Sequence, residues 1–328
     1  MDSPIFFVGT PRSGTSLLSR IVGSHPEIAV PFESHFFNGF VPWLRYYGDL
    51  AVRRNRNRLL RDLLQSVRLR EWIPRVNAQN ARTNIEASGR FDFPGIIAGI
   101  MESWCNAQGK RRWGEKTPHH IFFADQIIEG FPRAQFIHIV RDGRDVAVSW
   151  KRVKFGPEHV YPSARRWAEV LETGRRLKEL LGPAQYLELR YEDLLQDAEA
   201  TIRRICHYLG EAYSPEMHYF YRTNEKYPTD ARNEANIAKP VMANNTGQWP
   251  RYLSPREIRI FEAVAGDTLE SYGYERACKN PRLSRLERAF CKYIEHPPRK
   301  IVPMLTNRKS QVETLVRALM YLRLRAGL

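Results

Sequence analysis

Hydroxyl side chains, glycines and an arginine cluster in residues 9–16, which read Gly-Thr-Pro-Arg-Ser-Gly-Thr-Ser. Because the apolar run 4–8 precedes them, the pattern predicts a buried strand, a glycine-bearing loop and the first turn of a helix. The free backbone N–H groups of such a loop and the positive end of the helix dipole bind an anion whatever chemistry follows. A nucleotide-binding P-loop carries a lysine after its second glycine, whereas this chain has Thr15 there and places a cation, Arg12, inside the loop. The residues therefore indicate an anion-binding loop but disfavour an ordinary ATPase or GTPase.

Further chemically active side chains follow other apolar runs that predict strands. In each case the polar residues come directly after the run: Glu33 after 28–32, Arg141 after 134–140, and Arg190 and Tyr191 after 185–189. Helical spacing of apolar residues predicts helices between these runs, among them 15–24, 144–153 and 163–181. This alternation favours a parallel sheet with right-handed crossovers. Because ligands of open α/β sheets bind at the carboxyl ends of the strands, we expect these side chains to gather around the 9–16 loop.

The overall composition limits the class of protein. The chain has 328 residues, 43% of them hydrophobic, which suits one large α/β domain with insertions or two small domains. A formal charge of +15 favours a nucleotide, an acidic substrate or an anionic membrane as partner, with a merely solubilising surface as the alternative. Four scattered cysteines without metal-binding spacing predict free thiols and a reducing compartment. The sequence shows no basic leader and no run of about 18 apolar residues, so we expect a cytoplasmic protein or one bound at a membrane surface.

Two segments interrupt or extend the predicted α/β domain, which we expect to span residues 1–275. Residues 39–112 predict a helical insertion, whose stretch 52–70 carries seven arginines and one acidic residue. That stretch is either an amphipathic helix with a solvated basic face or a lid for an anionic acceptor. Residues 276–328 predict a basic helical extension, whose last helix has an apolar face made of Val312, Leu315, Val316, Leu319 and Leu322. This helix either docks on the core or lies on a membrane or a partner.

Three short motifs, in order along the chain, resemble those of the sulfotransferases that use 3′-phosphoadenosine 5′-phosphosulfate (PAPS). Residues 10–18 are similar to the 5′-phosphosulfate loop of that family, residues 139–149 to its 3′-phosphate motif, and residues 190–194 to a third family motif. The resemblance covers roughly residues 4–255, and the Pro-Arg-Ser-Gly-Thr form of the loop is similar to the protein-tyrosine and bacterial branch. It implies an α/β, P-loop-like three-layer sandwich with a central parallel sheet.

The resemblance also implies which residues hold PAPS and its product, 3′,5′-ADP. Arg141 would grip the 3′-phosphate through two parallel hydrogen bonds, and Ser149 would reach the same phosphate if its helix packs alongside. Trp249 either packs near the adenine or fills the core, and the preceding Gly247 and Gln248 depart from the serine or basic residue that the family often has there. The implied cofactor-binding residues are Arg12, Ser13, Gly14, Thr15, Ser16, Arg141, Ser149, Tyr191 and Trp249.

For the reaction, the resemblance implies transfer of a sulfuryl group to an acceptor hydroxyl, with no metal ion expected. Negative charge grows on the departing phosphate, so a cation there lowers the barrier, and Arg12 is the first candidate and Lys116 the second. The acceptor must lose a proton to a general base. Glu33 lies 21 residues after Arg12 and matches the place of the catalytic glutamate in the tyrosine-sulfating branch. His35 is the reserve candidate for this base.

The acceptor and two other functions stay open at this level. A glycan, lipid-linked or tyrosine hydroxyl would suit a glutamate base, and a P-loop kinase or NTPase is the alternative enzyme. A non-catalytic basic module that binds anions or a membrane is the alternative from another class. Nucleic acid is not an expected partner, because the chain carries no recognisable nucleic-acid-binding motif.

Overall fold

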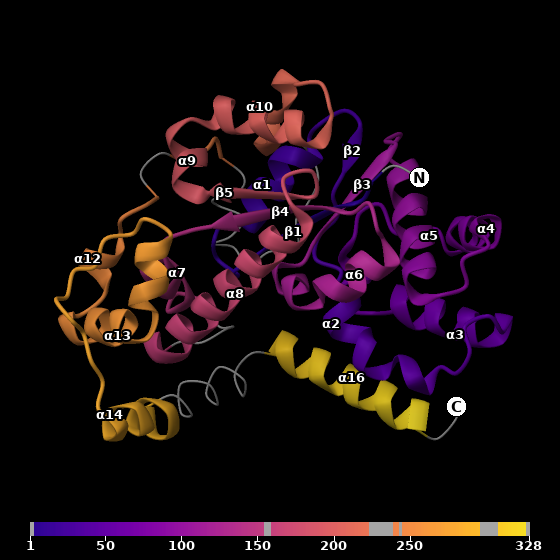
Figure 1. The fold of residues 1–328 in the computed structure, drawn as a ribbon. Coiled ribbons are helices and arrows are strands. Elements are labelled where there is room, and N and C mark those ends of the chain that lie inside the picture. Colours follow the sequence, from indigo (N-terminus) through magenta and orange to yellow (C-terminus); the bar gives the residue numbers. More distant parts are fainter. Residues whose placement is uncertain (1–2, 154–158, 223–238, 243–244, 296–307, 326–328) are drawn as a thin grey trace.

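In the computed structural model, a five-stranded parallel sheet with the strand order β2-β3-β1-β4-β5 forms the middle of the molecule (Figure 1). The structure describes residues 3–153, 159–222, 239–242, 245–295 and 308–325. The strands are β1 Ile5–Gly9, β2 Ile28–Ala29, β3 Arg112–Lys116, β4 Gln135–Val140 and β5 Tyr186–Arg190. Because all pairs are parallel, the carboxyl ends of the strands meet at one edge of the sheet, as predicted.

The helices before β4 include the whole insertion. They are α1 Thr15–Gly23, α2 Phe36–Phe40, η1 Val41–Tyr46, α3 Arg53–Leu64, η2 Leu69–Glu71, α4 Ala78–Ser88, α5 Phe93–Asn106, η3 Pro118–Phe123 and α6 Ala124–Gly130. The later helices are α7 Gly143–Trp150, α8 Val160–Leu181, α9 Tyr191–Gln196, α10 Ala198–Leu209, η4 Pro215–Arg222, α12 Trp249–Tyr252, α13 Pro255–Ser271, α14 Arg285–Phe290, η5 Cys291–Glu295 and α16 Arg308–Arg325.

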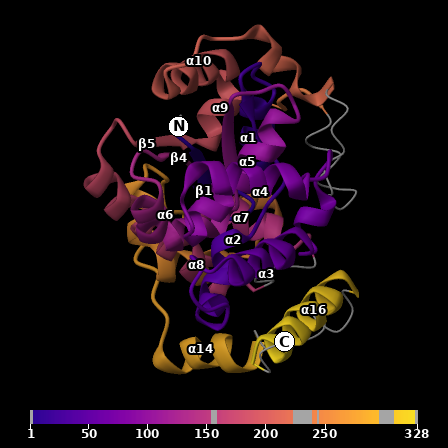
Figure 2. The ribbon, with the colours of Figure 1, turned by 90° about the vertical axis from the view of Figure 1, so that its right-hand side faces the viewer.

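Helices cover both faces of the sheet and so make three layers. Successive side chains of β1 point to opposite faces, as the pleat of a strand requires. Ile5 and Phe7 join the hydrophobic cluster that includes α1 and α10, whereas Phe6 and Val8 join the cluster that includes α5 and α8. Figures 1 and 2 show α10 on one side of the sheet and α8 on the other. The predicted three-layer α/β sandwich is confirmed.

Four of the five strands were predicted from their apolar runs, with ends that shift by at most three residues. The missing strand is β3, whose sequence Arg-Trp-Gly-Glu-Lys is not an apolar run. All of its residues are nevertheless buried, because its charged groups have partners. Arg112, for example, donates to the backbone oxygens of Ser3 and Leu209 at 2.8 and 2.7 Å. These partners lie far from β3 in the sequence, so periodicity alone could not identify the strand.

The helical insertion between β2 and β3 packs its apolar side chains into the same hydrophobic cluster as Phe6 and Val8 of β1. Leu59, Leu60 and Leu63 of α3 are buried. Arg56, from the arginine-rich stretch, is only 4% exposed; it donates to the oxygens of Leu50 and Ala51 at 2.9 Å each. This arginine therefore ties the insertion together and is not part of a solvated basic face.

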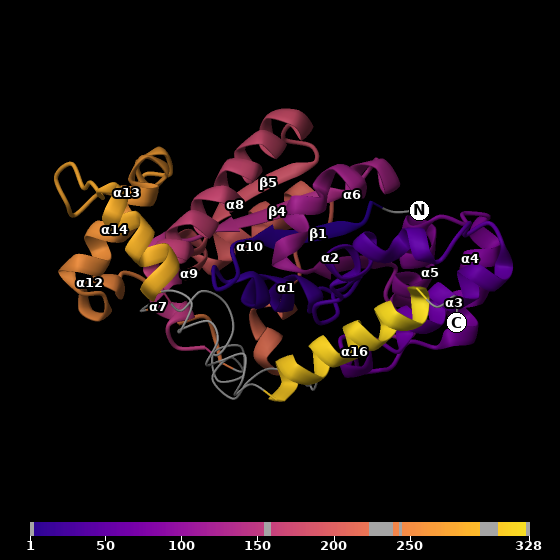
Figure 3. The same ribbon diagram turned by 90° about the horizontal axis from the view of Figure 1, so that it is seen from below.

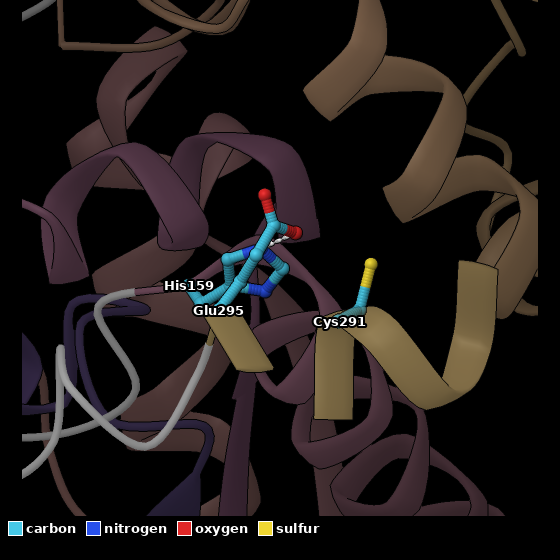
Figure 4. Close-up of side chains that lie close together, drawn as sticks. All are labelled: His159, Cys291 and Glu295. Atoms are coloured by element: carbon cyan, nitrogen blue, oxygen red, sulfur yellow. Dashed lines mark hydrogen bonds and ion pairs between the residues drawn. The ribbon is translucent and has the colours of Figure 1, made fainter. Parts of the chain in front are cut away.

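The C-terminal extension returns to the rest of the molecule at two places. At η5, His159 bonds to Glu295 at 3.1 Å, as the dashed line in Figure 4 shows. At α16, the ring of Tyr321 lies 4.8 Å from that of Trp43 in η1, and Leu324 is buried. Figures 1 and 3 show α16 lying alongside α2 and α3 of the insertion. Residues 296–307, which belong to the predicted extension, lie outside the described part of the chain.

Candidate active site

The loop between β1 and α1 has a backbone that is preset for an anion. Arg12 and Gly14 adopt left-handed conformations, with φ of 80° and 96°. A Cβ atom at Gly14 would lie 2.4 Å from the ring of Tyr191, so this position needs glycine for space as well as for φ. The hydroxyls of Thr10 and Ser13 are buried and have no hydrogen-bond partner in the described part of the chain. Since an unsatisfied buried hydroxyl costs about 1–3 kcal/mol, an oxyanion that accepted from these groups would stabilise the loop.

A cavity of about 400 Å³ opens beside this loop. Its volume lies within the usual range for small-molecule sites. Of the predicted nucleotide-binding residues, those that line it are Arg12, Gly14, Thr15, Ser16, Arg141, Ser149 and Tyr191. Residues separated by more than 170 positions in the sequence thus meet in one place, because the parallel sheet brings their strand ends together. We call this space the donor cavity.

Arg141, directly after β4, is the central cation of the donor cavity. It is 6% exposed, and its guanidinium lies 4.5 Å from the centre of the Tyr191 ring. It donates to the backbone oxygen of Asn245 at 2.6 Å, and the Asn245 side-chain amide donates to the Tyr191 hydroxyl at 2.9 Å. The three residues therefore hold one another in position at the carboxyl edge of the sheet.

Ser149 lies on α7, which packs alongside the loop. Arg12 donates from Nε to the Ser149 hydroxyl oxygen at 3.0 Å. Ser149 therefore lies next to the loop and lines the donor cavity. The same bond directs the Arg12 side chain across the cavity toward α7.

Trp249 does not itself line the donor cavity, although Asp145 and Gln248 do. Its ring packs on the Arg144 guanidinium at 3.8 Å, and Arg144 is in turn paired with Asp142 and Glu262. The backbone N–H groups of residues 247, 248 and 249 all donate to the Asp145 carboxylate, at 2.7 to 2.9 Å. Burial raises the pKa of Asp145, and the nearby Arg141 and these N–H groups oppose that shift. In the structure, the Trp249 ring thus packs on a buried arginine.

Glu33, four residues after β2, forms an ion pair with Lys116, the last residue of β3. Lys116 is fully buried; its Nζ donates to Glu33 Oε1 at 2.7 Å and to Ser16 Oγ at 3.2 Å. The other carboxylate oxygen of Glu33 bonds to His35 Nε2 at 3.0 Å. Burial acts to raise the pKa of Glu33, but Lys116 and His35 outweigh it and hold the pKa well below its ordinary value. Glu33 is therefore a carboxylate at neutral pH, with 23% of its side chain exposed.

A buried network behind this pair fixes the segment that carries it. The hydroxyls of Ser34 and Thr117 each donate to Glu115 Oε1 at 2.6 Å, and His120 Nδ1 bonds to Oε2 at 2.7 Å. Thr117 also accepts from the backbone N–H of His35 at 3.2 Å. His35 has a left-handed backbone with φ of 55°, so this bond helps to hold a strained position. Sequence reasoning gave Glu115 no role, because its contact with Ser34, 81 residues away, leaves no sign in the local pattern around Thr117 and His120.

A family model described as "Sulfotransferase family" matches residues 4–215. The chain belongs to the sulfotransferase family. The predicted resemblance is confirmed, and the family match favours sulfuryl transfer over the kinase and the non-catalytic binding module.

Named relatives among curated proteins are distant in sequence. An uncharacterized protein from Aquifex aeolicus is 26% identical over 266 residues, which cover 76% of this chain but only 30% of that protein. The omega-hydroxy-beta-dihydromenaquinone-9 sulfotransferase Stf3 of Mycobacterium tuberculosis is 27% identical over 320 residues, which cover 85% of this chain and 77% of that enzyme. The protein-tyrosine sulfotransferase of Drosophila melanogaster is 23% identical, covering 84% of this chain and 52% of that protein.

Solved structures of sulfotransferase domains share the fold. The domain from the Synechococcus PCC 7002 olefin synthase has a TM-score of 0.57 at 20% identity, covering 84% of this chain and 96% of that one. The domain from the curacin biosynthetic pathway has a TM-score of 0.59 at 17% identity, covering 84% and 99% respectively. At such identities the likeness concerns the fold alone.

One further group of potential metal ligands lies at the attachment of the extension, away from the sulfotransferase motifs. It consists of His159, Cys291 and Glu295 (Figure 4). Arg256 already pairs with both carboxylate oxygens of Glu295, at 2.9 and 3.1 Å, and His159 Nδ1 accepts from the Tyr161 N–H at the start of α8. We assign these contacts to holding η5 against α8. Among the described residues, no helix is both long and apolar enough to cross a membrane.

Proposed function

We propose that this sulfotransferase takes its sulfuryl group from PAPS and transfers it to a hydroxyl of the acceptor. The observation that carries the proposal is the junction at Ser16, which lines the donor cavity and also bonds to the Lys116–Glu33 pair. A nucleotide site and a candidate proton acceptor are therefore joined by two hydrogen bonds. PAPS supplies a sulfuryl group on a phosphate that becomes a more negatively charged leaving group as transfer proceeds.

The donor cavity fits a nucleotide with two separate anionic ends. We assign the 5′-phosphosulfate to the loop, whose contributions are its backbone N–H groups, the buried Ser13, and the cavity-lining Gly14, Thr15 and Ser16. We assign the 3′-phosphate to Arg141 and Ser149. Arg12 would lie between the two ends, because it belongs to the loop yet bonds to Ser149. No metal ligand is assigned to this cavity.

Lys116 and Glu33 would do the work of charge stabilisation and proton removal. Glu33 would accept the proton of the acceptor hydroxyl, and Lys116 would stabilise charge near the loop. The pair is coupled, since Lys116 lowers the pKa of Glu33. A lysine drawn toward negative charge growing at the loop would leave Glu33 more basic as the proton is taken. Arg12 remains the other candidate cation.

We propose that Trp249 supports the cavity indirectly. Its ring covers Arg144, and its N–H bonds to Asp145, which also lies 3.7 Å from Arg141. A direct contact with adenine is the second possibility for Trp249. The two possibilities are distinguished by measuring the affinity for a bisphosphate with a base and for one without a base.

The names of the relatives suggest hydroxyl acceptors of different classes. They include a menaquinone-derivative sulfotransferase and protein-tyrosine sulfotransferases. A lipid-linked, glycan or tyrosine hydroxyl is therefore the acceptor class that we propose, and no nucleic acid is proposed as a partner.

Calorimetric titration of the full chain with 3′,5′-ADP and with ATP, in EDTA, tests the donor. We expect micromolar binding of 3′,5′-ADP, much weaker binding of ATP, and loss of 3′,5′-ADP binding in Arg141→Ala. Arg165→Ala, which removes an exposed arginine on α8, is the matched control and should bind as wild type does. Preference for ATP, or no binding of either nucleotide to folded wild-type protein, would overturn the PAPS proposal.

A further inference from the structure

A second cavity, of about 360 Å³, lies between the helical insertion and α16. Its surface is mostly apolar, and its apolar lining comes from Phe40 of α2, Val67, and Val316, Leu319 and Met320 of α16. Two segments far apart in the sequence thus enclose one apolar space. We call it the α16 cavity.

The α16 cavity and the donor cavity are connected by one chain of polar contacts. Ser16 lines the donor cavity and His35 lines the α16 cavity. Between them, Ser16 Oγ lies 3.2 Å from Lys116 Nζ, Lys116 Nζ lies 2.7 Å from Glu33 Oε1, and Glu33 Oε2 lies 3.0 Å from His35 Nε2. The proposed base therefore lies between a cavity suited to anions and a cavity suited to an apolar molecule.

Besides His35, the charged side chains that line the α16 cavity are Asp62, Arg68, Arg70 and Arg323. Asp62 of α3 pairs with Arg323 of α16 and accepts from the Tyr47 hydroxyl at 2.9 Å. This pairing holds α16 against the insertion and leaves the apolar part of the lining without a competing buried acid. Ser34, Gln65 and Ser66 also line the cavity, but most of its surface is apolar, which suits an apolar chain better than a glycan with many hydrogen-bonding groups.

The outer side of α16 continues the apolar character of the cavity. Leu315, Leu319 and Leu322, which are spaced to share one helical stripe, are 57 to 61% exposed. Leu319 belongs both to this stripe and to the cavity lining. An exposed apolar stripe that runs into an apolar cavity is suited to a molecule that arrives from a lipid phase.

We propose that the acceptor is a lipid alcohol whose chain occupies the α16 cavity and whose hydroxyl reaches Glu33 beside His35. This inference rests on the proposed function and adds the substrate class. The alcohol oxygen would form a bond to sulfur while the bond from sulfur to the donor phosphate breaks. The hydroxyl proton would pass to Glu33, and the products would be a sulfate monoester and 3′,5′-ADP.

Binding of 1-dodecanol and 1-butanol to the full chain, in the presence of 3′,5′-ADP, tests the inference without depending on turnover. Both alcohols are used dissolved, so that no membrane contact is needed. We expect saturable dodecanol binding at one site, and at least tenfold weaker binding of butanol. Gly39→Leu should weaken dodecanol binding at least tenfold by filling the cavity, because a Cβ at Gly39 meets only the Cβ of His35, at 3.9 Å.

A matched pair of variants on α16 controls for loss of binding that is caused by a folding defect. Leu319→Glu places a charge at the cavity and should weaken dodecanol binding at least tenfold. Leu315→Glu places the same charge on the same exposed stripe but outside the cavity lining, and should change it less than twofold. Turnover with labelled PAPS then checks that wild type sulfates dodecanol. It also checks that Leu319→Glu lowers the rate of sulfation more than Leu315→Glu does.

The outcomes separate the two proposals. If 3′,5′-ADP binds but Gly39→Leu and Leu319→Glu leave dodecanol binding and sulfation unchanged, the lipid-alcohol inference is wrong and the donor proposal stands. The lipid-alcohol inference is also wrong if wild type, Gly39→Leu and Leu319→Glu sulfate a tyrosine peptide or a glycan at equal rates. If 3′,5′-ADP does not bind, the donor proposal itself has failed.

Discussion

The donor cavity and the α16 cavity are similar in volume but opposite in construction. Cationic and hydroxyl side chains at strand ends make up much of the donor cavity, and a rigid parallel sheet sets their positions. The lining of the α16 cavity is mostly apolar and comes from helices that meet across 261 residues of sequence, as the Asp62–Arg323 pair does. The donor cavity is therefore a consequence of the sheet topology, whereas the α16 cavity depends on the helical insertion and on α16.

The two cavities also place different demands on the groups that join them. An anionic donor needs cations close by, whereas proton removal needs a carboxylate that no cation fully neutralises. In the proposed function, Lys116 would serve the first demand and limit the second, since it lowers the pKa of Glu33. Changes at this junction should therefore affect the reaction far more than they affect the binding of either ligand.

The largest expected effect is that of Glu33→Gln. Loss of the proposed general base should lower kcat by about 10²–10⁴-fold, because positioned bases contribute that much to proton transfer. The 3′,5′-ADP and dodecanol affinities should each stay within about threefold of wild type, since neither cavity is lined by Glu33. Steady-state sulfation and calorimetry on the same samples check this, with Glu129→Gln, at an exposed position of α6, as the charge-matched control. A kcat within threefold of wild type would remove Glu33 from the reaction.

The donor cavity was largely predictable from sequence because short motifs fix its geometry. Gly14 must be glycine where the loop meets Tyr191, and Arg141 must follow directly on β4. Each of these requirements fixes the residue type at one position of a short motif, so the motif can be identified from a short stretch of sequence.

Strand β3, the roles of Asn245 and Asp145, and the α16 cavity were not predicted, because they depend on partners that are distant in the sequence. β3 escaped prediction because its buried charges are satisfied by remote groups, such as Ser3 and Leu209 for Arg112. The roles of Asn245 and Asp145 depend on a loop that folds back onto α7. No periodicity indicates that α16 would close a cavity beside His35, since that requires the helix to dock on the insertion.

Arg141→Lys should separate the two cavities by binding alone. A lysine keeps the charge but loses the planar, bidentate fork, and one lost charge-assisted hydrogen bond is worth about 1.5–3 kcal/mol. We expect 3′,5′-ADP to bind about 10- to 100-fold more weakly, with dodecanol affinity unchanged. Arg165→Lys is the control for the substitution itself. Equal weakening of both ligands would mean that the donor cavity and the α16 cavity are not independent.

The junction should also contribute to acid sensitivity. The folded-state pKa of Glu33 lies below its ordinary value of 4.5, so its carboxylate stabilises the fold above that pH. This contribution is lost as pH falls through the folded-state pKa. The stability difference between wild type and Glu33→Gln, from urea midpoints between pH 7 and pH 3, should therefore be largest at neutral pH and shrink in acid. A difference that grows as pH falls would contradict the assigned direction of the shift.

The smallest expected effect concerns the edge of the donor cavity, at Trp249. If its ring only covers Arg144, Trp249→Leu removes a cation–π contact worth about 0.5–1 kcal/mol, which acts on 3′,5′-ADP indirectly. The affinity should then fall less than about fivefold. If the ring instead stacks on adenine, the loss should reach about 1–3 kcal/mol and should disappear when the ligand is a bisphosphate without a base. Calorimetry with 3′,5′-ADP and with ribose 3,5-bisphosphate distinguishes the two, because only a stacking tryptophan makes the penalty depend on the base.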